Sequence, residues 1–121
     1  MKLKSIILFS SNPKLLTEFY RKVLNMEPDW INGEYADFKA GDTYFEIGPH
    51  SEVISKNLNP QRCILNFHVE DVESEFERIE KSGAKVIKEV YTPKEDTRLK
   101  IATFADPDGN YFQIMSDWTL F

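Results

Sequence analysis

The chain has 121 residues, of which 41% are hydrophobic and 13% aromatic, which suits one packed domain and excludes a disordered chain. Twenty acidic against fifteen basic side chains give a formal net charge of −5, and no run of Lys or Arg could neutralise a nucleic-acid backbone. Cys63 is the single cysteine, which excludes an intramolecular disulfide and favours a reducing cytoplasm.

The beginning of the chain predicts a strand that leads into a helix. Residues 5–9 form an apolar run that is too short for a signal-peptide core, so we expect a buried strand. Asn12 and Pro13 suit the cap and the first turn of a helix. Its apolar residues form one stripe that is expected to face a sheet: Leu15, Leu16, Phe19, Tyr20, Val23 and Leu24.

Three more strands are expected in the first half, and the second half repeats the order. The first set lies at residues 29–31, 35–40 and 44–47, with a turn at Gly41 and Asp42. In the second half a strand at 63–69 leads to a helix capped by Asp71 and ending at Gly83. Strands at 85–90, 100–105 and 111–115 follow.

Residues also match between the halves, at a nearly constant spacing. Ala36 and Phe38 correspond to Ala102 and Phe104, 66 residues later, and residues 44–47 correspond to 111–114, 67 residues later. One inserted residue in the turn before the last strand explains the difference. A duplicated module is the simplest interpretation.

The two modules, the Phe19-Tyr20 pair and the segment 106–113 (Asp-Pro-Asp-Gly-Asn-Tyr-Phe-Gln) together resemble the vicinal oxygen chelate superfamily. This superfamily contains glyoxalases, bleomycin-resistance proteins and extradiol dioxygenases. The resemblance implies one α+β domain over residues 1–121, with two βαβββ modules that form a curled mixed sheet around a cavity and helices on the outside. The modules are expected at about 2–48 and 62–116, with a linker at 49–61. The resemblance also implies a homodimer.

Metal-using members of that superfamily hold their ion at four positions, which correspond here to Ser5, Glu46, Ile64 and Gln113. One carboxylate and one amide beside an alcohol and an alkyl group form a poor site for a transition metal. His68, four residues beyond Ile64 on the same strand, is too far away to replace it. We therefore expect no divalent metal and no other cofactor.

Alternation along the expected strands places acidic, aromatic and polar side chains on the cavity wall. The leading hypothesis is metal-free binding of a small organic molecule, because acidic groups among aromatic rings suit a cationic, flat or amphipathic ligand. Neither nucleic acid nor a membrane is an expected partner. The predicted ligand-binding residues are Phe9, Tyr35, Asp37, Tyr44, Glu46, Asn66, His68, Tyr111 and Gln113.

Two alternatives stay open at this point. The first is a lyase, isomerase or dioxygenase in which Glu46 is the catalytic acid or base, or a residual metal ligand, while His68, Tyr44 or Gln113 orients the substrate. The second is a protein-interaction module whose cavity is filled by its own side chains. Trp30 and Trp118 are candidates for a lid over the cavity or for a contact between subunits.

Overall fold

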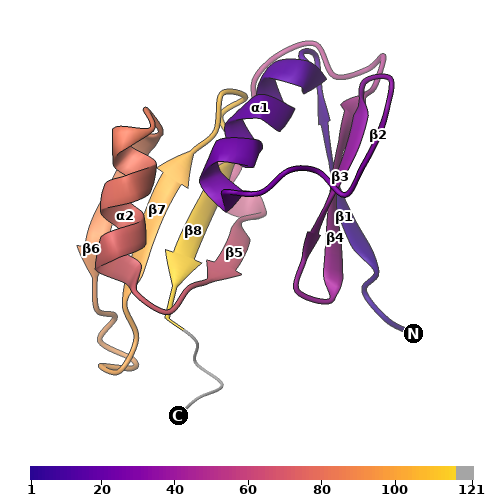
Figure 1. Cartoon of the computed structure of the whole chain (residues 1–121). Coiled ribbons are helices and arrows are strands. Elements are labelled where there is room, and N and C mark those ends of the chain that lie inside the picture. Colours follow the sequence, from indigo (N-terminus) through magenta and orange to yellow (C-terminus); the bar gives the residue numbers. More distant parts are fainter. Residues whose placement is uncertain (117–121) are drawn as a thin grey trace. The chain divides into compact units, whose positions relative to one another are not determined.

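The computed structural model describes residues 1–116 (Figure 1). The chain forms two compact units, Met1–Lys56 and a second that begins at Asn57. The first unit contains β1 (Ser5–Ser10), α1 (Pro13–Leu24), β2 (Trp30–Asn32), β3 (Tyr35–Ala40) and β4 (Thr43–Pro49). The second contains a short 3₁₀ turn (Pro60–Arg62), β5 (Leu65–His68), α2 (Val72–Lys81), β6 (Lys85–Tyr91), β7 (Ile101–Ala105) and β8 (Tyr111–Met115).

Each unit has one four-stranded mixed sheet, and the strand order is the same in both. The first sheet runs β1-β4-β3-β2 and the second β5-β8-β7-β6. The first strand of each unit pairs in parallel with the last strand, whereas the hairpin partners are antiparallel. The predicted α+β fold of two βαβββ modules is confirmed.

Helix α1 begins as its sequence predicts. The Asn12 side chain accepts a hydrogen bond from the amide of Leu15 at 3.3 Å, and Asn25 ends the helix with a left-handed φ of 52°. The Tyr20 ring contacts Phe45 of β4 edge-on, with the ring centroids 4.8 Å apart. One residue of the predicted stripe was misplaced: Leu15 is 52% exposed, because the helical step turns it about 100° away from the buried Leu16.

Helix α2 repeats this arrangement on the second sheet. Asp71 is the cap, and its carboxylate accepts from the amide of Ser74 at 3.1 Å. Phe76 packs against Phe104 at 5.3 Å, and Phe104 stacks on Phe112 at 5.4 Å. The aromatic residues that recur in the sequence therefore form the core between each helix and its own sheet.

Two predicted strands differ from the observed ones. Strand β1 is covered on one face only, since Ile7 is 45% and Phe9 37% exposed. Strand β5 spans Leu65–His68 rather than the predicted 63–69, and residues 63 and 64 connect it to the 3₁₀ turn at Pro60–Arg62. Ile64 therefore precedes the strand and is 38% exposed.

The segment 106–110 forms a closed turn before β8. Asp106 is 5% exposed, and its carboxylate accepts hydrogen bonds from the amides of Asp108 and Asn110 and from the Asn110 side chain, at 2.9–3.0 Å.

Within residues 1–116, neither helix has the length and apolarity needed to cross a membrane.

Candidate functional site

The first sheet has one face packed on α1 and one face that the helix leaves uncovered. Phe38, Phe45 and Ile47 point toward the helix and are at most 4% exposed. Because side chains alternate along a strand, their neighbours in sequence lie on the opposite face. We call this opposite surface the open face. The strand register arranges its residues in rows that run across the sheet: Ser5, Tyr44 and Lys39; then Ile7, Glu46, Asp37 and Trp30; then Phe9, Gly48, Tyr35 and Asn32.

The middle row, which we call the carboxylate row, places two acidic side chains directly opposite each other. Asp37 of β3 is the cross-strand partner of Glu46 of β4. Ile7 of β1 lies on the other side of Glu46, and Trp30 of β2 lies on the other side of Asp37. The two carboxyl groups are therefore flanked by an aliphatic and an aromatic side chain.

Burial and the neighbouring charge both act on Asp37. Burial raises the pKa of Asp37, and the negative charge of Glu46 raises it further. Neither carboxyl group forms an ion pair or a hydrogen bond with the residues that the structure describes. Two lysines lie beside Tyr44 in the adjoining row: Lys39 is the strand partner of Tyr44, and the Lys4 ammonium lies 5.6 Å from the centroid of the Tyr44 ring.

The third row is aromatic, and it depends on a glycine. A Cβ atom at Gly48 would lie 2.5 Å from two carbons of the Tyr35 ring, so the ring rests directly on the glycine backbone. The Phe9 ring contacts His50 edge-on at 5.0 Å. Trp30, Tyr35 and Phe9 are 50%, 45% and 37% exposed, so aromatic surface is available beside the carboxylate row.

The corresponding row of the second sheet carries no carboxylate, and it ends in a lysine, since Lys88 of β6 is the strand partner of Thr103. Gln113 of β8 lies between Asn66 of β5 and Thr103 of β7. Gln113 corresponds to Glu46 of the first sheet, Asn66 to Ile7, and Thr103 to Asp37. Gln113 and Thr103 thus replace two carboxylates with an amide and an alcohol. His68 is the strand partner of Met115, and Tyr111 that of Ala105.

The nine predicted ligand-binding residues thus fall into two groups. Each group lies on the face of its own sheet that the helix does not cover. The first unit supplies Phe9, Tyr35, Asp37, Tyr44 and Glu46, and the second supplies Asn66, His68, Tyr111 and Gln113.

The metal positions of the superfamily fit an ion poorly in either unit. The first unit offers the Ser5 hydroxyl and the Glu46 carboxylate, and the second offers the Gln113 amide and the alkyl side chain of Ile64. Among the described residues, no group of three or more His, Cys, Asp or Glu side chains is placed to hold an ion. No reaction step is therefore assigned to a metal.

Sequence reasoning missed Gly48 and assigned Trp30 to a lid or a subunit contact rather than to the open face. The sequence does contain a signal for both. Each hairpin has a two-residue loop with a left-handed glycine, Gly33 at φ 61° and Gly41 at φ 65°. Such loops set the register, and the register places Trp30 beside Asp37 and Tyr35 over Gly48. Trp118 lies outside the described residues.

Fold and sequence comparisons assign this chain to a family. The model of the Glyoxalase/Bleomycin resistance protein/Dioxygenase superfamily matches residues 2–114, so the chain belongs to that superfamily, and the predicted resemblance is confirmed.

Individual relatives are similar over almost the whole chain. The chain is 30% identical over 125 residues to the uncharacterized protein YraH of Bacillus subtilis strain 168, covering 94% of this chain and 97% of YraH. A glyoxalase-related enzyme from Fulvimarina pelagi shares the fold with a TM-score of 0.77 at 16% identity, covering 97% of this chain and 88% of that one. A glyoxalase/bleomycin resistance protein/dioxygenase family enzyme from Burkholderia phytofirmans PsJN also has a TM-score of 0.77, at 19% identity, covering 96% and 98%.

Proposed function

We propose that the protein binds a small organic cation with a flat apolar body on the open face of the first sheet, and that this binding needs no metal. One observation carries the proposal: Asp37 lies directly opposite Glu46, and neither carboxyl group is paired with a cation in the described part of the chain. Like charges at directly opposite positions destabilise a sheet by about 0.2–1 kcal/mol. A cationic group between them removes this repulsion and gains charge-assisted contacts.

The surroundings of the two carboxyl groups determine the rest of the ligand. Trp30, Tyr35 and Phe9 expose aromatic surface on the same face. A cation over an aromatic ring gains about 0.5–2 kcal/mol, and the gain grows as water is excluded. A flat aromatic cation therefore suits this face better than a small hydrated ion does. Binding without turnover also resembles what the bleomycin-binding members of the superfamily do.

The test compares N-methylquinolinium, a planar aromatic cation, with neutral quinoline by isothermal titration calorimetry. We expect N-methylquinolinium to bind and quinoline to bind at least about 10-fold more weakly, because only the cation meets the carboxylates. Asp37→Asn and Glu46→Gln should each weaken binding of the cation by about 10-fold, equivalent to about 1.4 kcal/mol. Both substitutions keep the side-chain shape, so a loss would report charge rather than packing.

Two control variants remove the same charges elsewhere in the first unit. Asp42 lies in an exposed turn and Glu52 is exposed after β4, so Asp42→Asn and Glu52→Gln should leave the affinity unchanged. Equal losses in the controls would show that only net charge matters. Equal affinity for quinoline would contradict the proposal, and so would metal-dependent turnover of a hemithioacetal or a catechol.

One observation favours a second candidate, an enzyme that transfers protons without a metal. Asp37, with its raised pKa, lies next to Glu46, so an acid and a base can act from neighbouring strands. Deuterium incorporation from D₂O into hydroxyacetone, followed by NMR, tests this activity. The candidate predicts incorporation about 100-fold faster with the wild type than with Glu46→Gln, and equal rates would eliminate it.

The homodimer, the cytoplasmic location and the protein-interaction hypothesis stay predictions. Sedimentation velocity of the purified chain tests the first of them. A species of twice the mass of the 14.1 kDa chain is expected, and a monomer at every concentration would contradict the prediction.

A further inference from the structure

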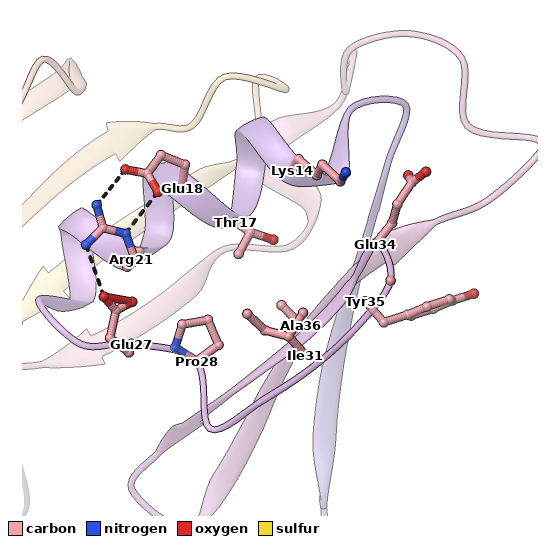
Figure 2. A pocket seen from close by; sticks show the side chains of 11 residues that line it. Lys14, Thr17, Glu18, Arg21, Glu27, Pro28, Ile31, Glu34, Tyr35 and Ala36 are labelled. Carbon is pink, nitrogen blue, oxygen red and sulfur yellow. Dashed lines mark hydrogen bonds and ion pairs between the residues drawn. The ribbon is translucent and has the colours of Figure 1, made fainter.

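The first unit has a pocket on the other side of its sheet, between α1 and the β2–β3 hairpin (Figure 2). Its volume is about 280 Å³, close to the lower limit of small-molecule pockets. Ile31 and Ala36 form part of its wall, and this cross-strand pair lies on the sheet face that α1 covers. Neither Asp37 nor Glu46 lines the pocket, so it is separate from the carboxylate row.

The base of the pocket is apolar. Pro28, Ile31 and Ala36 contribute carbon surface, and Figure 2 shows them together below the helix. Ile31 is 62% exposed although it belongs to a strand. A ligand with an aliphatic group would cover this surface and gain about 25 cal/mol for each Å² removed from water.

One end of the pocket is closed by an ion-pair cluster. The Arg21 guanidinium donates to both oxygens of Glu18 at 2.6 and 2.9 Å and to Glu27 at 3.5 Å. These carboxylates raise the pKa of Arg21, and Arg21 lowers the pKa of Glu18. All three groups are paired with one another, and the two carboxylates leave this end with a net negative charge, so it offers no cation to the carboxylate of a ligand.

The opposite end carries one unpaired charge of each sign. Lys14 comes from the first turn of α1 and Glu34 from the hairpin loop, and both line the pocket. Neither side chain has an ion pair or a hydrogen bond with the described residues. Figure 2 shows them on opposite walls, at the end away from Arg21, with the Thr17 side chain on the helix between the two ends.

From this arrangement we infer that the pocket binds a free α-amino acid with an aliphatic side chain. The carboxylate of the amino acid pairs with Lys14, its ammonium group pairs with Glu34, and its side chain covers Pro28 and Ile31. A simple anion or a simple cation would satisfy only one of the two charged groups. The inference does not use Asp37 or Glu46, on which the function proposed for the open face depends. Tyr35 lines this pocket and also belongs to the open face, so the two sites must be told apart by other residues.

The test uses leucine and two analogues that each lack one charged group, 3-methylbutylamine and 4-methylpentanoate. Each is titrated into ¹⁵N-labelled protein, and the backbone amide shifts are followed by NMR. Leucine at about 10 mM should shift the amides of Lys14, Gly33 and Glu34, with a Kd in the millimolar range. Each analogue should bind at least about 10-fold more weakly than leucine.

Variants assign the two charged contacts separately. Lys14→Gln should weaken leucine binding about 10-fold and leave 3-methylbutylamine unaffected, because the amine has no carboxylate. Glu34→Gln should weaken leucine and the amine but leave 4-methylpentanoate unaffected. The matched controls are Lys56→Gln and Glu52→Gln, which are exposed and lie outside the pocket, and they should bind leucine like the wild type.

Three results would overturn the inference: no shift with leucine, equal binding of leucine and both analogues, or leucine shifts confined to the amides of Asp37 and Glu46. N-methylquinolinium, titrated in parallel, should shift the amides of Asp37 and Glu46 and not that of Lys14. Failure at one site is therefore distinguishable from failure at the other.

Discussion

Replacing Asp37 with Asn should make the protein more stable at neutral pH while it weakens binding of an organic cation. Asp37 faces Glu46 directly across the β3–β4 pair, and its side chain makes no hydrogen bond that the substitution would break in the described part of the chain. Relief of the cross-strand repulsion predicts a gain of about 0.2–1 kcal/mol in the free energy of unfolding. A stabilising substitution that lowers affinity would mark Asp37 as a binding residue rather than a structural one.

The gain should depend on pH in a definite direction. Burial and the Glu46 charge raise the pKa of Asp37 above its ordinary value of 3.8. The folded protein therefore holds this proton more tightly than the unfolded chain does, so stability falls as the pH rises from about 3.8 through the raised pKa. The advantage of Asp37→Asn should thus be complete at about pH 7.5 and vanish at about pH 3.5.

Urea denaturation of the wild type, Asp37→Asn and the exposed control Asp42→Asn at both pH values provides the measurement. The control should differ from the wild type by less than about 0.5 kcal/mol at either pH. In a Glu46→Gln background the gain from Asp37→Asn should shrink, because the opposing charge is gone. A loss of stability at about pH 7.5, or a gain of the same size at both pH values, would refute the reasoning.

Two further predictions concern packing and the turn before β8. Gly48→Ala should destabilise the wild type by about 1 kcal/mol, because the new Cβ would lie 2.5 Å from the Tyr35 ring. In a Tyr35→Ala background the same substitution should stabilise the protein by about 0.5 kcal/mol. Urea denaturation measures both effects, and stabilisation in both backgrounds would contradict the contact between Gly48 and the Tyr35 ring. Asp106→Ala should lower the free energy of unfolding by about 2–3 kcal/mol, since the buried Asp106 carboxylate accepts three hydrogen bonds. Asp108→Ala should lower the free energy of unfolding much less, because the Asp108 Oδ2 is buried without a hydrogen-bond partner among the described residues. Thermal denaturation compares the two variants, and equal decreases in melting temperature would contradict this prediction.

The elements of this fold could be predicted because their signals are local. Asn12 and Asp71 cap the two helices through their own side chains, and the apolar alternation along β4 and β8 matches the observed burial. The internal repeat was readable for the same reason, since equivalent strands bury equivalent residues. An error arose at Ile64, which the apolar pattern places in a strand although β5 begins one residue later, at Leu65.

The carboxylate row could be predicted only in part. Strand alternation placed Asp37 and Glu46 on the same face, but their direct opposition depends on the β3–β4 register. Two-residue loops encode that register, whereas the extent to which Asp37 is buried depends on side chains from other strands. The pocket beside α1 had no sequence signal, because its walls come from a helix and a hairpin whose distance the sequence pattern does not specify.

The sequence alone determined the helices, the strands, the duplicated module and the chemical types of residue that are available to a site. Short-range periodicity, caps and turns encode all of these, and each acts within a few residues. Only the tertiary structure decided that Asp37 opposes Glu46 without a cation, that Tyr35 rests on Gly48, and that Lys14 and Glu34 share a pocket. The reason is physical: the distances between side chains on different elements are set by how those elements pair and pack, and no local pattern contains them.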